Sequence, residues 1–169
     1  MKEEPRTDAR RDERRTVAGL ELKWREFAPS DAAGGVGGAA GARSEGFGIW
    51  VPVDPDVLLD QITEAEYYAF DERMPYFGAI WPSAESLVPR LLAGPALDGR
   101  DVLDLGCGLG SCGFAASRRG AHVTFVDWEP RALEIAEQSA LHQEAPLSRF
   151  DFIVADWRKP PKLRPFDLI

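Results

Sequence analysis

The second half of the chain alternates between short apolar runs and longer segments with helical spacing of hydrophobic residues. Val102-Leu-Asp-Leu is a run of the length that forms a buried strand, and Gly106 ends it. Further along, the same signals predict a helix at Ser111–Arg119, a strand at Ala121–Val126, a helix at Pro130–Gln143 and a strand at Phe150–Ala155. Strands that alternate with helices of about ten residues are typical of βαβ units. The pattern predicts an α/β fold with a partial, Rossmann-like, doubly wound and mostly parallel sheet.

A fourth strand begins near the end of the chain. Phe166-Asp-Leu-Ile has the apolar character of a strand start, and the sequence stops at Ile169. Open doubly wound sheets normally have about five or more strands. We therefore expect this sequence to be a C-terminally truncated piece of a larger domain.

The first 45 residues lack this pattern. Met1–Arg15 is almost entirely charged, with both signs mixed, and Asp31–Arg43 is almost entirely Gly and Ala. Gly-rich chain has high entropy when free and little to bury when ordered. Thr16–Ala28, between these two segments, is compatible with a strand or a short helix. We interpret residues 1–45 as a disordered N-terminal tail with a Gly/Ala linker and expect the folded part to span residues 46–169.

The segment that follows the tail carries three weaker signals. Phe47–Val53 resembles a short strand, and Val57–Phe70 has roughly helical spacing. After an aromatic stretch, Ser83 is placed to cap a helix over Ala84–Ala93. Pro89 lies inside that helix and predicts a kink or an early break.

Composition narrows the class of protein. The 169 residues include 20 Lys+Arg against 28 Asp+Glu, a formal net charge of −8, and 44% are hydrophobic. No apolar stretch reaches the ~18 residues that a membrane-spanning helix needs, so we expect no membrane partner. An acidic chain without a basic cluster beyond its first residues also argues against nucleic acid. The charged N-terminus is unlike a signal or transit peptide, which makes the cytoplasm the expected compartment.

The most informative segment is the turn that follows the strand at residue 102. Gly106, Gly108 and Gly110 alternate there, and missing Cβ atoms allow a tight turn and let a ligand lie against the backbone. From Gly106 the segment reads G-x-G-x-G, and from Gly108 it reads G-x-G-x-x-G, the dinucleotide fingerprint. The two cysteines in this segment, Cys107 and Cys112, are too few for a disulfide framework or a metal site.

Asp104 helps to distinguish the two interpretations, because it lies near the end of an otherwise apolar strand. A buried carboxylate without a partner is unfavourable by several kcal/mol, so a cation or several N–H donors should face it. The phosphates of a dinucleotide would be repelled there, whereas the ammonium and sulfonium of S-adenosylmethionine would be attracted. The alternative is that backbone amides of its own turn satisfy Asp104.

The other two strands also end in acids, at the edge of the sheet where open α/β folds bind ligands. Asp127 follows the second strand and is placed to accept the hydroxyls of a ribose, or to cap the next helix. Trp128 beside it is a candidate for stacking on adenine or for ordinary packing. Asp156 and Trp157 close the third strand, and Asp156 is a candidate acceptor for the adenine amino group.

Together these motifs resemble a known family. VLDLGCGLG, VDWEP and ADW are similar to the cofactor half of the class I (seven-β-strand) S-adenosylmethionine-dependent methyltransferases, over about residues 76–169. PYFGAIWPSAESLVPRLL resembles a signature of the branch with protein-lysine and nicotinamide-methyltransferase-like enzymes, with Tyr76-Phe77 in place of Tyr-Trp. That branch's motif after the fourth strand would lie beyond Ile169, so no catalytic residue is assigned.

The resemblance implies that S-adenosylmethionine is the cofactor and that residues 46–169 are the N-terminal, cofactor-binding part of a methyltransferase domain. It implies cofactor contacts by Trp81, Asp104, Gly106, Gly108, Gly110, Asp127, Asp156 and Trp157, with Trp128 as the stacking candidate.

Asp54–Glu72 holds seven acidic residues and no basic one, which indicates either a solvated helix face or a rim that attracts a basic segment.

We therefore expect methyl transfer to a protein side chain, lysine first, with a small-molecule acceptor also open. Two alternatives remain: an NAD(P)-dependent oxidoreductase, which needs the Gly108 register, and a non-catalytic module that binds a cofactor or a partner. Neither the number of methyl groups added nor the oligomeric state follows from the sequence.

Overall fold

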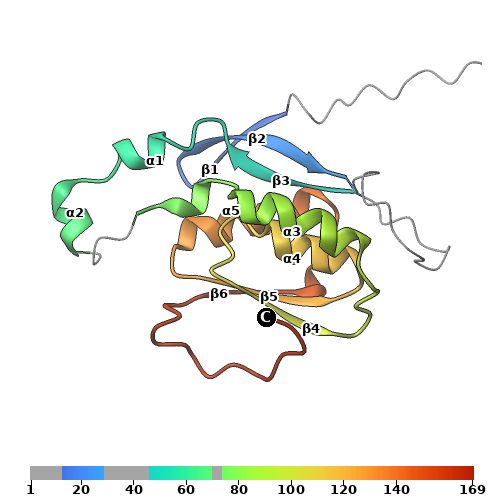
Figure 1. Ribbon diagram of the computed structural model, residues 1–169. Coiled ribbons are helices and arrows are strands. Elements are labelled where there is room, and N and C mark those ends of the chain that lie inside the picture. Colours follow the sequence, from blue (N-terminus) through green and yellow to red (C-terminus); the bar gives the residue numbers. More distant parts are fainter. Residues whose placement is uncertain (1–12, 29–45, 70–73) are drawn as a thin grey trace, which may run out of the picture.

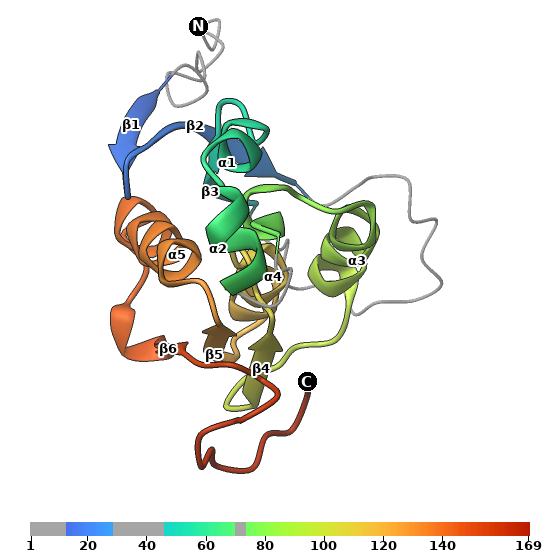
Figure 2. The ribbon, with the colours of Figure 1, turned by 90° about the vertical axis from the view of Figure 1, so that its left-hand side faces the viewer.

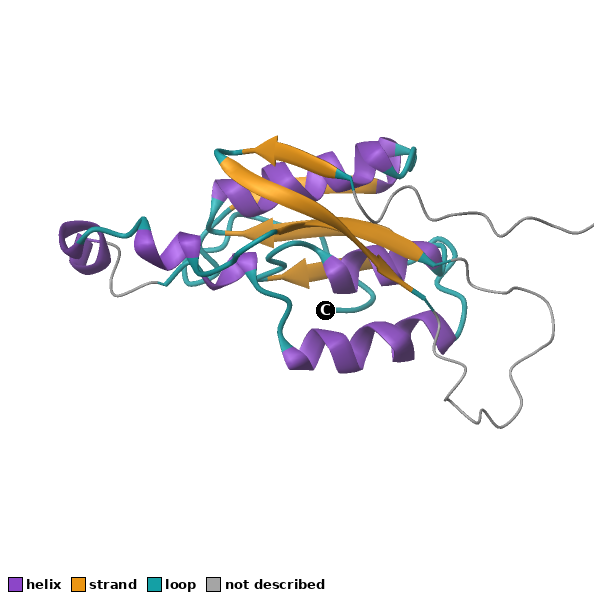
Figure 3. Ribbon diagram, turned by 90° about the horizontal axis from the view of Figure 1, so that it is seen from above, coloured by secondary structure: helices purple, strands orange, loops and turns teal. Residues whose placement is uncertain are grey.

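The computed structural model describes residues 13–28, 46–69 and 74–169, which form three layers (Figure 1). An antiparallel sheet lies at the top of this view, three helices form the middle, and a parallel sheet lies at the bottom. Figure 2 shows the three middle helices, α5, α4 and α3, side by side between the sheets. Seen from above, the strands of the upper sheet leave the lowest helix of the view, α3, uncovered (Figure 3), and β3 packs against α5 and α4.

The lower layer is the predicted parallel sheet. Its strands are β4 (Asp101–Leu105), β5 (His122–Asp127) and β6 (Phe150–Val154), in the order β4-β5-β6. Both pairings are parallel, and the connections run through α4 (Ser111–Arg118) and α5 (Pro130–His142). A short 3₁₀ turn, η2 (Leu147–Arg149), precedes β6. The expected Rossmann-like α/β fold is confirmed, with boundaries within two residues of the prediction.

The chain then crosses back to the other side of β4. Leu168 forms a parallel bridge with Val102, and the Leu103 amide donates to the Leu168 carbonyl at 2.9 Å. β4 therefore lies between this returning segment and β5. Ligands in open α/β sheets bind where the strand order reverses, at the carboxyl ends of the strands. The reversal places the expected ligand site above the end of β4.

The middle layer includes α3 (Pro82–Ala93), which packs beside α4 (Figure 2). The helix begins at Pro82, so the predicted cap at Ser83 is wrong. Proline is favoured at the first helical position because its missing N–H would have no partner there. The early break expected at Pro89 is also wrong, because the helix continues to Ala93. Val88 and Leu92, both 1% exposed, pack into the core and offset the lost hydrogen bond.

The upper layer contradicts the predicted tail over residues 14–27. β1 (Arg14–Val17), β2 (Leu20–Phe27) and β3 (Phe47–Pro52) form an antiparallel sheet in that order. Val17 pairs with Leu20 across a two-residue turn whose residues both have positive φ, as hairpin turns require. β2 alternates buried and more exposed side chains and so covers the helices with its apolar face. Residues 1–12 and 29–45 lie outside the described part of the chain.

Short helices connect the upper sheet to α3. α1 (Val57–Asp60) and α2 (Glu64–Ala69) replace the single helix predicted over Val57–Phe70, whose last residue lies outside the described part. A 3₁₀ turn, η1 (Tyr76–Gly78), precedes α3. The helix breaks at Ile62-Thr63, two β-branched residues with restricted side chains. No helix in the described residues is long and apolar enough to cross a membrane.

Candidate functional site

The glycine turn leaves the end of β4 and enters α4. Gly106, Gly108 and Gly110 have φ values of +70°, +52° and +80°, in the left-handed region that glycine tolerates best. The amides of Gly106 and Cys107 both donate to the Val126 carbonyl, at 2.8 and 3.1 Å. The turn is thus tied to the end of β5.

Two of these glycines have different surroundings. A Cβ on Gly110 would lie 2.9 Å from Cε1 of Phe125, so this position is filled by the core. A Cβ on Gly106 would meet no atom within 4 Å, apart from its own chain neighbours. The absence of a side chain therefore serves packing at Gly110 and leaves open space over the backbone at Gly106.

That open space belongs to a pocket of about 300 Å³ between the turn and the segment that leads into α3. Four predicted cofactor-binding residues line it: Trp81, Asp104, Gly106 and Gly108. The volume lies at the lower end of the range for small-molecule sites, roughly 300–1,000 Å³. Residues from the segment before α3 and from the turn after β4 thus meet around one cavity.

Asp104 contributes a half-buried carboxylate to this pocket. Its Oδ2 accepts a hydrogen bond from the Gly113 amide at 2.8 Å, so the alternative of backbone satisfaction holds for one N–H. Burial raises the pKa of Asp104 from 3.8 to about 6; the Gly113 hydrogen bond opposes this rise and the charge of Asp127 adds to it. A cation that enters the pocket would stabilise the ionised form of the Asp104 side chain.

Asp127 is more deeply buried, at 6% exposure, and does not line the pocket. Its Oδ2 accepts from the Gly108 amide at 2.8 Å and its Oδ1 from the Glu129 amide at 3.0 Å. The carboxylate thus holds the glycine turn against the start of α5. Glu129 caps that helix by accepting from the Arg131 amide, so the predicted capping role of Asp127 is wrong. Its contact with a ribose stays a prediction.

Two aromatic side chains form the opposite wall. The indole N–H of Trp81 donates to the Tyr76 carbonyl at 3.2 Å, and the two rings meet edge to face with centroids 5.4 Å apart. Trp81 is 49% exposed, and both residues line the pocket. Exposed aromatic faces beside a carboxylate suit a ligand that combines apolar surface with positive charge.

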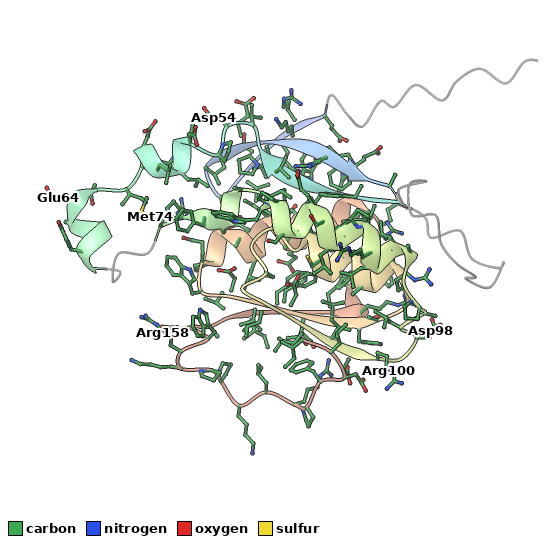
Figure 4. All side chains as sticks on the ribbon, viewed as in Figure 1. Asp54, Glu64, Met74, Asp98, Arg100 and Arg158 are labelled. Atoms are coloured by element: carbon green, nitrogen blue, oxygen red, sulfur yellow. The ribbon has the colours of Figure 1, made fainter. Side chains whose placement is uncertain are left out.

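The residues that follow β6 do not reach this pocket. The Asp156 carboxylate pairs with Arg158, with a distance of 3.1 Å between Oδ2 and Nη2. Figure 4 shows Arg158 at one end of the molecule, with Asp98 and Arg100 at the other. Trp157, which follows Asp156, is 61% exposed. Trp128, which follows β5, is half-buried and does not line the pocket either. Contacts of these residues with adenine stay predictions.

The two cysteines line the pocket as weakly acidic thiols. Burial and the nearby Asp104 raise the pKa of Cys112 from 9.0 to about 11. Burial and the charges of Asp104 and Asp127 raise the pKa of Cys107 well above its usual range. Both thiols therefore stay protonated at neutral pH, which makes them poor nucleophiles. The described residues contain no cluster of three or more side chains that could hold a metal ion.

The sequence interpretation missed Glu129 and Arg131, which flank the proline that begins α5. Glu129 is 8% exposed, and its carboxylate accepts two bonds from the Arg131 guanidinium, at 3.1 and 3.3 Å. An acidic residue directly before an N-terminal proline indicates a helix cap. The sequence Glu-Pro-Arg therefore indicates a helix cap at Glu129. The Arg131 guanidinium also lies over the Phe77 ring, a contact between residues distant in sequence for which the sequence carries no signal.

The part of the chain that contains the glycine turn resembles known proteins. Residues 102–169 match the family model described as "Methyltransferase domain". The chain is 43% identical over 56 residues to the cypemycin N-terminal methyltransferase of a Streptomyces species, covering 33% of this chain and 23% of that protein. It is 38% identical over 85 residues to the electron transfer flavoprotein beta subunit lysine methyltransferase of Danio rerio, covering 48% of this chain and 32% of the relative.

Solved structures give weaker likenesses. A phosphoethanolamine N-methyltransferase 2 of Haemonchus contortus, in complex with phosphomonomethylethanolamine and S-adenosylhomocysteine, aligns over 89% of this chain and 36% of that one, with 23% identity and a TM-score of 0.37. The same enzyme with S-adenosyl-L-methionine aligns over 86% and 36%, with 19% identity and a TM-score of 0.34. The chain spans no more than about a third of the curated relatives described above. The residues that resemble a methyltransferase domain, 102–169, include the glycine turn and the acids at the ends of β4 and β5.

Proposed function

We propose that this chain is the cofactor-binding part of an S-adenosylmethionine-dependent methyltransferase whose acceptor is a protein side chain, lysine first. The observation that carries the cofactor assignment is the pocket in which Asp104, Trp81 and the open backbone of Gly106 face one cavity. The assignment of a protein acceptor is supported by the names of two relatives and by the charge around α1 and α2.

The residues of the pocket fit the chemistry of this cofactor. Asp104 presents a carboxylate whose ionised form is disfavoured until a positive group approaches, and S-adenosylmethionine carries both an ammonium and a sulfonium. The open space over Gly106 allows a ligand to lie against the turn. A pyrophosphate in the same place would face the Asp104 charge and would be repelled, which disfavours the oxidoreductase alternative.

When bound, the cofactor supplies a methyl group activated by the positively charged sulfur. The chain would then have three tasks. Asp104 would orient the cationic end, and Trp81 with Tyr76 would provide aromatic faces that attract positive charge. The pocket walls would exclude water, which favours the neutral, nucleophilic form of an amine acceptor.

Two observations support a protein acceptor. The relative from Danio rerio is a lysine methyltransferase, and the cypemycin relative is an N-terminal methyltransferase. Asp54, Asp56, Asp60 and Glu64 are exposed around α1 and α2, the short helices at the left of Figure 1. Negative charge there would attract a basic segment of a protein substrate.

Transfer of a labelled methyl group tests this proposal. The protein is incubated with methyl-tritiated S-adenosylmethionine and a cell extract, and labelled proteins are separated and hydrolysed to identify the methylated residue. We expect label in lysine, and much less label with Asp104→Asn. Label confined to small molecules would contradict the protein acceptor. In calorimetry, tight binding of NADPH in place of S-adenosylhomocysteine would contradict the cofactor.

A further inference from the structure

Arg131 connects three parts of the molecule that surround the glycine turn, although it does not line the pocket itself. It lies in the first turn of α5, directly after the proline that begins the helix. Its guanidinium pairs with Glu129 through two hydrogen bonds, lies 5.3 Å from the centroid of the Phe77 ring, and donates to the Gln61 side chain at 3.5 Å. One side chain thus contacts the start of α5, the Phe77 ring in η1 and Gln61 at the end of α1.

The first connection leads to the turn. Glu129 is almost fully buried and donates its amide to Asp127, whose other carboxylate oxygen accepts from the Gly108 amide. A buried carboxylate such as that of Glu129 needs a positive partner, and the two-pronged guanidinium supplies both charge and fixed geometry. Arg131 therefore stabilises the arrangement that places the Gly108 amide against Asp127.

The second connection leads to the wall of the pocket. Phe77 is 7% exposed and lines the cavity, and the guanidinium lies over its ring. The Phe77 carbonyl is also the nearest atom to the position that a Cβ on Gly108 would occupy, at 3.2 Å. The wall and the turn are therefore in close contact at this point, and a shift of Phe77 would change the space available to a ligand.

We propose that Arg131 is a positioning residue. It sets the distance between Phe77, which lines the pocket, and the glycine turn, and it thereby increases the affinity for the cofactor. This rests on the proposed function. The residue acts through Glu129 and Phe77 and touches no reacting atom. A lysine at this position would keep the charge near Phe77 but lose the two-pronged contact with Glu129.

Calorimetry with S-adenosylhomocysteine on the full chain tests this role. We expect Arg131→Met, which keeps the apolar stem, to raise the dissociation constant about tenfold, with Arg131→Lys in between. Arg100→Met is the matched control, because it removes an exposed ion pair with Asp167 at the far end of the sheet (Figure 4). The control should bind as the wild type does. If Arg131→Met fails to fold, Arg131→Lys decides, with an expected rise of about threefold.

A second measurement separates positioning from general stability. Phe77→Leu is combined with Arg131→Lys, and we expect the two effects on binding to be non-additive, because both act on the same wall. Additive effects, or a dissociation constant unchanged by both Arg131 variants, would overturn the proposal while leaving the cofactor assignment intact. Failure of the wild type to bind S-adenosylhomocysteine at all would instead overturn the proposed function together with this inference.

Discussion

Replacement of Asp104 by asparagine keeps the shape of the side chain and removes its charge. The amide oxygen can still accept the hydrogen bond from the Gly113 amide, so the local geometry is retained. In the wild type the carboxyl has a pKa of about 6 in the folded chain against 3.8 as the ordinary value. Ionisation of Asp104 therefore destabilises the folded chain, by up to about 3 kcal/mol once the pH lies above both values.

The sign of this effect fixes the pH dependence. Because the folded-state pKa of Asp104 is raised, its contribution to the free energy of unfolding is most favourable below pH 3.8. This contribution is lost as the pH rises through about 6, and the free energy of unfolding stays lower above that pH. We expect Asp104→Asn to be more stable than the wild type at pH 8, by up to about 3 kcal/mol, and to differ by less than ~1 kcal/mol at pH 4. Urea unfolding followed by tryptophan fluorescence at both pH values measures the difference.

The same carboxylate should make cofactor binding depend on pH. Only about a tenth of a carboxyl with a pKa of about 6 is ionised at pH 5, so wild-type affinity for S-adenosylmethionine should fall about tenfold between pH 8 and pH 5. Asp104→Asn should bind more weakly and without this pH dependence. A variant that is no more stable at pH 8 would refute the unfavourable burial of the charge. A variant that binds S-adenosylmethionine as tightly as the wild type would refute the contact with a cation.

Three substitutions and one alkylation experiment separate the roles of residues around the pocket. Gly110→Ala should lower the free energy of unfolding by about 2 kcal/mol, because φ is +80° and the added Cβ would overlap the Phe125 ring. Gly106→Ala should be milder, about 1 kcal/mol, but should weaken binding of S-adenosylhomocysteine in calorimetry because its methyl group enters the open space. Trp81→Ala should bind about tenfold more weakly with little change in stability, since the side chain is half-exposed; an unchanged affinity would place the ligand elsewhere. Cys112 should react with iodoacetamide far more slowly at pH 7.5 than a free thiol and should accelerate toward pH 11; rapid alkylation at neutral pH would contradict its burial.

The parallel sheet and its helices were predictable because each element carries its own local signal. A strand such as β4 is a short apolar run, and glycine or proline marks each transition, as Gly106 and Pro130 do. These signals depend on neighbours in sequence. They can therefore be recognised in the sequence alone, and they locate each element to within a residue or two.

The antiparallel sheet was not predictable in the same way, because its stability comes from distant partners. Trp24 is buried against Trp50, with ring centroids 5.1 Å apart, and against His142 of α5 at 4.4 Å. The Trp50 amide donates to the hydroxyl of Ser139, also in α5. Polar and charged residues between the apolar positions of β2 made Thr16–Ala28 ambiguous, and the helices that cover it follow much later in the chain.

The acids that end the three parallel strands show why the site was only partly predictable. Asp104, Asp127 and Asp156 carry the same sequence signal, an acidic residue near the end of an apolar run or just after it, yet each meets a different partner. Asp127 accepts two backbone amides, and Asp156 pairs with Arg158. Asp104 has one amide partner and lines the pocket. Which backbone N–H reaches a carboxylate depends on the path of the turn in space. The spacing of the acids along the sequence therefore locates the edge of the sheet but not their partners. The hydrogen bonds and the pocket then distinguish Asp104 as the acid placed to meet a cation.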